Sequence, residues 1–357
     1  MAPLRLRDRD AIVTREGLIF RVFGYSHPAN AYICDVEYAP ANIFKSDNLK
    51  AFRSIGHEVF YKFYEDEGWK FVKKNFSQYM IFHKMLCKNV VGVKLPNVVK
   101  VRKPDGKLRQ LINKKLTDEL LVALQDVLEL VINHSGLSIA NFGVFGSMLH
   151  GFYHPKFSDI DLIIYGSSNI AKLRETLQEL YSDKYSPFRN EFENAESIEG
   201  KKWRFKNYSP SEFMWHQQRK MVYGLYSDEQ SRRVIKTEFE PVKDWREIEY
   251  KNFVETKIVQ KGWVKMLARI SEDNDAPFIP SVYTIQPIKV LNGPREAEDA
   301  IRVVSYMEEF RLQAMRDEKV YIEGNLEEVT TSKDSFHQIA LTYCPKYYEQ
   351  VLKVASR

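Results

Sequence analysis

The N-terminal third of the chain is patterned for β-structure. Short runs in which apolar residues alternate with polar ones, or follow one another, are separated by glycine, proline and asparagine, which favour turns. The segment between residues 23 and 32 predicts a hairpin of the runs on either side, and Pro104-Asp105-Gly106 predicts a second hairpin turn. The runs expected to form strands cover residues 18–23, 32–38, 57–64, 98–102 and 107–112.

The middle of the chain alternates between helical and strand patterns. Thr117-Asp118-Glu119 provides an N-cap oxygen and acidic residues for a helix start, apolar residues then recur with helical spacing, and Gly136 predicts the end. Ser209 followed by Pro210 predicts another capped helix. We expect helices over residues 117–136, 169–181 and 209–221, and strands over 139–145, 159–165 and 234–242.

From about residue 255 the pattern returns to β-structure. Strands are expected over 257–271, 282–290, 301–310, 320–330 and 336–342. So many strands in a short segment are typical of a small barrel, of which the oligonucleotide-binding fold is one type, and strand counting leaves other small barrels open. The sequence therefore predicts an α+β chain with a β-rich N-terminal domain, a mixed central domain and a β-rich C-terminal domain, at residues 1–112, 113–252 and 253–357.

Two aspartates follow a Gly-Ser turn in the central domain. One apolar run ends at Gly146-Ser147, and the next begins with Asp159-Ile160-Asp161-Leu162. Residues i and i+2 of a strand point to the same face, roughly 6.6 Å apart along the chain. We therefore expect both carboxylates on one face of this strand, with the apolar side chains on the other.

These residue types suit a bound metal and a phosphate. Two like charges ~5 Å apart repel by about 3 kcal/mol at an effective dielectric of 20, and hard oxygen ligands such as Asp159 and Asp161 favour Mg²⁺ (or Mn²⁺). Gly146 allows a triphosphate to approach the main chain, and Ser147 can donate to a phosphate oxygen. The alternative is a tight turn followed by an acidic strand on a solvated face.

At these residues the chain resembles the polymerase-beta-like nucleotidyltransferase superfamily. Its motif is a hydrophobic residue, Gly, then Gly or Ser, a spacer, and Asp-hydrophobic-Asp/Glu-hydrophobic, matched by Phe145-Gly146-Ser147 and residues 159–162. The resemblance covers residues 117–182, about a fifth of the chain. The three-part layout also resembles archaeal proteins known mainly as predicted nucleotidyltransferases. The resemblance implies that Gly146 and Ser147 bind the nucleotide, and that Asp159 and Asp161 are catalytic metal ligands.

The resemblance also implies a third carboxylate on a later strand. Glu238, between Thr237 and Phe239, is the best match, and Glu240 is the second. The superfamily prefers Asp at this place, and a strand with a solvated, charged face is the alternative interpretation.

Positive charge is concentrated in one segment. The 357-residue chain has a net charge of +5, whereas residues 84–115 carry +9, so the rest of the chain is negative. Such a local excess favours a polyanionic partner, RNA or DNA; the alternative is a hairpin whose lysines keep a sheet edge soluble. The candidate nucleic-acid-binding residues are Lys100, Arg102, Lys103, Lys107 and Arg109.

The rest of the composition indicates a cytosolic protein. No uninterrupted apolar stretch approaches the ~20 residues of a membrane span, and the charged first ten residues do not resemble a secretory signal. The three cysteines are far apart and show neither disulfide nor metal-site spacing, which favours a reducing compartment.

Together these features predict a cytoplasmic, Mg²⁺-dependent transferase that uses a nucleoside triphosphate such as ATP. An acceptor hydroxyl, expected on nucleic acid, attacks the α-phosphate and releases pyrophosphate. Two alternatives stay open: an enzyme that nucleotidylates a protein or a small molecule, and a catalytically silent member that binds nucleic acid or a nucleotide.

Overall fold

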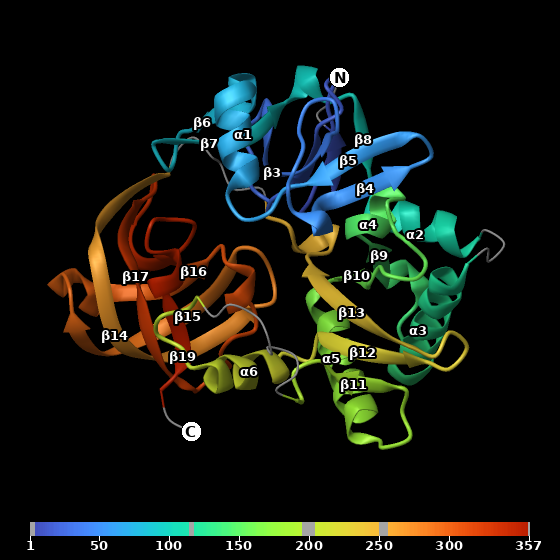
Figure 1. Cartoon of the computed structure of the whole chain (residues 1–357). Coiled ribbons are helices and arrows are strands. Elements are labelled where there is room, and N and C mark those ends of the chain that lie inside the picture. The colour runs from blue at the N-terminus through green and yellow to red at the C-terminus, as the bar shows by residue number, and fades with distance from the viewer. Residues whose placement is uncertain (1–3, 114–117, 195–203, 250–255, 356–357) are drawn as a thin grey trace. The chain divides into compact units, whose positions relative to one another are not determined.

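The computed structural model describes residues 4–113, 118–194, 204–249 and 256–355, in two compact units (Figure 1). The first unit comprises Met1–Thr176 with Tyr226–Phe253, and the second comprises Leu177–Leu225 with Val254–Arg357. The fold is mixed α+β, as the sequence predicts. The three domain ranges predicted from the sequence stay a prediction.

An eight-stranded sheet forms the N-terminal part of the first unit, in the order β4-β5-β3-β2-β1-β8, with β7 paired to β3 and β6 to β7. The predicted hairpin of β2 and β3 is confirmed. Helix α1 (Glu67–Asn75) was not predicted. The strands are β1 (Ala11–Val13), β2 (Ile19–Val22), β3 (Ala31–Pro40), β4 (Phe52–Ile55), β5 (Glu58–Lys62), β6 (Met80–His83), β7 (Lys88–Lys94) and β8 (Lys100–Arg102).

The hairpin predicted around Pro104-Asp105-Gly106 is wrong. Strand β8 pairs with β1, and Pro104 is the first residue of helix α2 (Pro104–Ile112). Proline at the first helical position lacks only an N–H that would have no partner there, and an acid in the first turn interacts favourably with the helix dipole. Leu108 and Leu111 of this helix are buried, so the helix packs through one apolar face.

A five-stranded sheet forms the central part of the chain, in the order β11-β12-β13-β10-β9. Strands β10 and β13 are parallel, whereas β9 runs antiparallel to β10. The predicted helix start and end at residues 118–136 are confirmed, since Asp118 accepts from the amide of Leu121 at 3.1 Å and Gly136 has φ +65°; Thr117 lies outside the described residues. The elements are α3 (Glu119–Ser135), β9 (Phe142–Val144), α4 (Gly146–His150), β10 (Ile160–Tyr165), α5 (Ser167–Ser182), β11 (Phe188–Asn190), β12 (Tyr223–Asp228) and β13 (Arg233–Val242).

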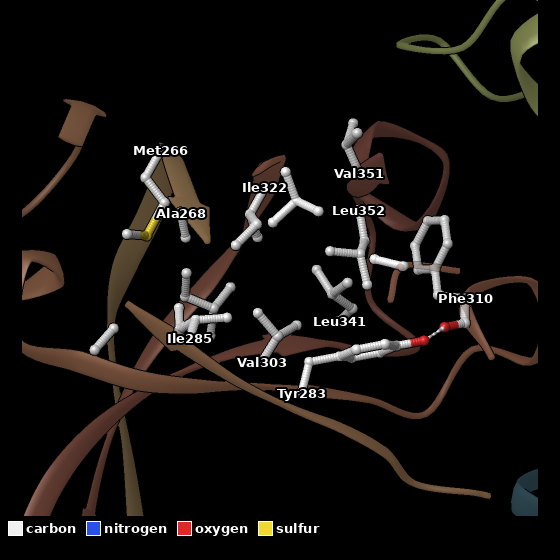
Figure 2. Close-up of a cluster of buried hydrophobic side chains, with 14 of the residues drawn as sticks. Met266, Ala268, Tyr283, Ile285, Val303, Phe310, Ile322, Leu341, Val351 and Leu352 are labelled. Atoms are coloured by element: carbon white, nitrogen blue, oxygen red, sulfur yellow. Dashed lines mark hydrogen bonds between the residues drawn. The ribbon is translucent and has the colours of Figure 1, made fainter. Parts of the chain in front are cut away.

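The C-terminal strands pair into a closed ring. Five of them follow the order β14-β15-β16-β18-β17, and β17 pairs with β14 to close the ring, while β19 is added at β17. A buried apolar cluster fills this unit, and the Tyr283 hydroxyl within it donates to the carbonyl of Phe310 at 2.6 Å (Figure 2). The elements are α6 (Pro210–Gln218), β14 (Lys257–Asp275), β15 (Ser281–Asn292), β16 (Ala300–Ser305), β17 (Lys319–Thr330), β18 (Ser335–Leu341) and β19 (Val351–Val354).

Candidate functional site

A glycine turn connects β9 to the short helix α4. Gly146 has φ +58°, a conformation that other residues rarely adopt. A Cβ at this position would also collide with the side-chain carboxylate of Asp161, so glycine is required both by the backbone and by its neighbour. The amide of Phe145 donates to the main-chain carbonyl of Asp161 at 3.1 Å, which fixes the turn against the start of β10. The hydroxyl of Ser147, partly exposed, has no hydrogen-bond partner among the described residues.

The two aspartates lie at the start of β10 on one face. Ile160 and Leu162 are fully buried, whereas the side chain of Asp161 is partly exposed and that of Asp159 is exposed. Among the residues that the structure describes, neither carboxylate has a hydrogen bond or an ion pair. Polar groups at partly buried positions usually have hydrogen-bond partners. These two carboxylates have none among the described residues, so both are available to a ligand.

The electrostatic environment disfavours ionisation of both carboxyls. Burial, and secondarily the charge of Asp159, raise the pKa of Asp161 to about 6. Burial also raises the pKa of Asp159, although this side chain reaches solvent. Lys62 and Lys236 oppose both shifts, and Arg233 opposes that of Asp159. A cation bound between the two carboxylates would relieve the repulsion between their negative charges.

Further along β10 the same face is covered. Ile163 and Tyr165 lie on the same face of β10 as Asp161, because residues two apart in a strand share a face. Both are buried in a cluster with Val242, against which Tyr25 and Phe145 pack. The carboxylate pair therefore occupies the accessible end of a strand whose remaining length is buried.

Glu238 is in register with Asp161 on the parallel strand β13, so both side chains point to the same face of the sheet. Its neighbours Thr237 and Phe239 are buried, and Glu238 itself is partly exposed. Within the described ranges, no group of three or more His, Cys, Asp or Glu side chains is arranged to hold a metal ion. The structure thus brings Glu238 beside the pair by register without assembling a three-carboxylate site.

Glu240 has a different environment. It is buried and accepts a hydrogen bond from the guanidinium of Arg9 at 2.7 Å. Arg9 is buried as well and belongs to the N-terminal segment that precedes β1. An ion pair of this kind neutralises the carboxylate within the fold.

The loop that leads into Asp159 is held by Arg233. Its guanidinium donates to the carbonyl of Pro155 at 2.8 Å and to that of Ser158 at 2.6 Å. Arg233 begins β13, so this strand carries Glu238 and also fixes the approach to the first aspartate. Sequence reasoning did not single out Arg233, Lys236 or Lys62, because no local spacing relates them to the motif.

The candidate nucleic-acid-binding residues differ in how they are used. Arg102 bonds to the ring and carbonyl of His150 at 2.9 and 3.2 Å, and Lys103 pairs with buried Asp10 at 2.5 Å, so both serve internal contacts. Lys100 is exposed, and Lys107 is partly exposed. Arg109 is 64% exposed and pairs with Asp105 one helical turn away. Lys114 and Lys115 of the basic segment lie outside the described residues.

Comparison with known proteins agrees with the motif. Residues 124–223 match the model of the nucleotidyltransferase domain, a range that contains the Gly-Ser turn and both aspartates but ends before Glu238. The chain is 26% identical, over 98% of its own length and 99% of the relative's, to the uncharacterized protein MJ1086 of Methanocaldococcus jannaschii.

No solved structure matches the chain significantly. No helix in the described part of the chain is long and apolar enough to cross a membrane. Residues 124–223 are thus similar to a nucleotidyltransferase domain, consistent with the polymerase-beta-like nucleotidyltransferase superfamily that the motif resembles.

Proposed function

We propose that the protein transfers a nucleoside monophosphate from a nucleoside triphosphate to an acceptor hydroxyl and releases pyrophosphate. The observation that supports this most is the pair of accessible carboxylates, Asp159 and Asp161, which lack protein partners among the described residues and adjoin the Gly146 turn. The three cysteines, Cys34, Cys87 and Cys344, are free thiols, which favours a reducing, cytosolic setting.

The residues present fit a divalent cation. The carboxylates supply hard oxygen donors, and their raised pKa values indicate that the unliganded pair is electrostatically unfavourable. Mg²⁺ or Mn²⁺ binds such sites through one or two carboxylates together with phosphate oxygens. When bound, the metal neutralises charge on the phosphates and favours ionisation of the acceptor hydroxyl.

The chain's own residues then position the reactants. Gly146 leaves space for the triphosphate at the main chain, and the Ser147 hydroxyl donates to a phosphate oxygen. The acceptor oxygen forms a bond to the α-phosphorus, the bond from that phosphorus to the bridging oxygen breaks, and pyrophosphate leaves. We propose Glu238 as the third carboxylate, which would take up the acceptor's proton, because register places it on the same face of the sheet as Asp161.

Nucleic acid is the acceptor that we propose. Exposed lysines lie on β7 (Lys88 and Lys94) and on β8 (Lys100). Closed five-stranded rings like that of the C-terminal unit include the oligonucleotide-binding folds. A protein or small-molecule acceptor is the second candidate, since Arg102 and Lys103 are committed to internal contacts and the basic surface is smaller than the sequence suggests.

The test is transfer of label from α-³²P-labelled nucleoside triphosphates, one at a time, in Mg²⁺ or Mn²⁺, to total RNA, DNA or protein. We expect labelled nucleic acid with wild-type protein and none with Asp159→Ala or Asp161→Ala. Label in protein would establish the second acceptor class. Absence of any transfer, together with triphosphate binding that survives both substitutions, would contradict the proposal and indicate a silent nucleotide-binding protein.

A further inference from the structure

Strand β5 of the N-terminal sheet packs against the end of helix α4 and the residues that follow it. The Phe60 ring on this strand lies 4.8 Å from the ring of Phe152, and both belong to a buried cluster with Leu149 of α4. Figure 1 shows the hairpin of β4 and β5 beside α4. Since residues i and i+2 of a strand share a face, Lys62 points to the side on which Phe60 meets the segment after the Gly-Ser turn.

The neighbouring strand fixes the position of Lys62 further. Lys62 is in register with Tyr38 of β3, and the Tyr38 ring lies 5.2 Å from that of Phe152 and 5.1 Å from that of His150. Tyr38 is buried, so this corner of the N-terminal sheet is firmly packed against the end of α4. Lys62 is therefore carried by a rigid element, which is what precise recognition of a ligand requires.

The ammonium group of Lys62 is close enough to influence the carboxylate pair without being bound by it. Its charge lowers the pKa of both Asp159 and Asp161 against the effect of burial. Among the described residues it nevertheless forms no hydrogen bond or ion pair, and the Tyr64 ring centroid is 5.7 Å away. Because Lys62 acts on both carboxylates through its charge and bonds to neither of them, its ammonium group remains available to a ligand bound at the pair.

The other cations near the pair are differently placed. The Arg233 guanidinium is committed to the carbonyls of Pro155 and Ser158. Lys236 lies on β13 beside Glu238 and has interactions of its own. Of the three cationic side chains in the described part of the chain that lower the pKa of one or both aspartates, Lys62 is thus the one available to a ligand. It belongs to β5 of the N-terminal sheet.

We propose, on the basis of the proposed function, that Lys62 binds the β- and γ-phosphates of the nucleoside triphosphate. A lysine ammonium is a compact point charge suited to phosphate oxygens. The carboxylates and metal would hold one side of the triphosphate and Lys62 the other. The N-terminal domain would then complete the nucleotide site instead of serving only as a surface for nucleic acid.

The experiment measures equilibrium binding of a nonhydrolysable α,β-methylene nucleoside triphosphate and of the matching monophosphate to the full-length protein in Mg²⁺. Lys62→Met removes the charge and keeps most of the apolar stem, and Lys62→Arg keeps the charge. Lys74→Met, at an exposed lysine of α1, is the matched control. We expect Lys62→Met to weaken triphosphate binding about tenfold or more and monophosphate binding less than about twofold, Lys62→Arg to restore part of the loss, and Lys74→Met to change neither.

The outcomes separate this inference from the function on which it rests. Equal triphosphate affinity in Lys62→Met and wild-type protein would overturn the role of Lys62 and leave the proposed function standing. An equal loss for triphosphate and monophosphate would overturn it too, because it would show general damage to the site. A wild-type protein that binds no triphosphate would refute both.

Discussion

Replacement of Asp161 by asparagine should stabilise the protein, and the gain should depend on pH. Asp161 has no hydrogen bond or ion pair among the described residues, and burial raises its pKa from 3.8 to about 6. The folded protein therefore retains a proton that the unfolded chain releases between pH 3.8 and about 6. Stability is lost as the pH rises through this window and stays lost above it. The asparagine side chain cannot ionise, so the variant escapes this loss.

The magnitude follows from the shift. One pKa unit corresponds to ~1.4 kcal/mol, so ionisation of Asp161 lowers the free energy of unfolding by up to about 3 kcal/mol at pH 8 and by well under about 1 kcal/mol at pH 4. Because the side chain is partly exposed, solvent screening makes this an upper limit. At about 2–4 °C per kcal/mol for a unit of 150–250 residues, the variant should melt several degrees above wild type at pH 8.

The assay is thermal unfolding of wild type and Asp161→Asn from pH 4 to pH 8 with a chelator present, repeated at pH 8 with excess Mg²⁺. The difference in melting temperature should grow with pH in chelator and shrink when Mg²⁺ is added, because metal binding stabilises only wild type. Asp47→Asn, at an exposed aspartate outside the site, is the matched control and should melt with wild type throughout. An Asp161→Asn variant that melts below wild type at pH 8 in chelator would show that the carboxylate supports the fold, and would refute the reasoning.

Two further predictions concern the other charged groups. Glu238→Gln should lower turnover by orders of magnitude in the transfer assay without changing the melting temperature. Glu240→Gln should remove one of the two carboxylates that pair with buried Arg9, the other being Asp8 at 3.6 Å, and should cost up to about 3–5 kcal/mol in denaturant unfolding; the reverse pattern would make Glu240 the ligand. Replacing the exposed residues Lys94, Lys100 and Arg109 together by Ala should reduce the slope of log affinity for nucleic acid against log salt concentration by about two to three. An unchanged slope would show that these residues do not bind nucleic acid.

The sequence predicts the motif region well because its signals are local. Gly146 needs a left-handed backbone, the aspartates alternate with buried Ile160, and Asp118 caps α3 through its own side chain. Each of these features depends on residues within a few positions. The Pro104 segment failed for the same reason, since Pro-Asp-Gly suits either a hairpin turn or a helix start, and the partner of β8 is the distant strand β1.

Charge is where local patterns mislead most. The alternating charges of the first ten residues give no sign of burial, yet Arg7 lies 3.6 Å over the Tyr165 ring and Asp8 accepts from the amide of Gly24 at 2.8 Å. Neither contact can be inferred from spacing, because the partners are on strands and turns far along the chain. A charged residue becomes buried wherever the fold supplies a partner.

Functional and structural charges near the site differ in whether the fold supplies them with a partner of opposite charge. Glu240 and Lys103 carry the charges that a sequence-based search would select, and the fold occupies both, with Arg9 and Asp10 respectively. Burial also makes the charge of Asp161 unfavourable, and none of the described residues forms a hydrogen bond or an ion pair with its carboxylate. The fold pairs Glu240 and Lys103 but leaves the Asp161 carboxylate, beside an accessible turn, without a partner. A ligand that supplies the missing positive charge explains this better than a fold that simply bears the free-energy cost of an unpaired charge.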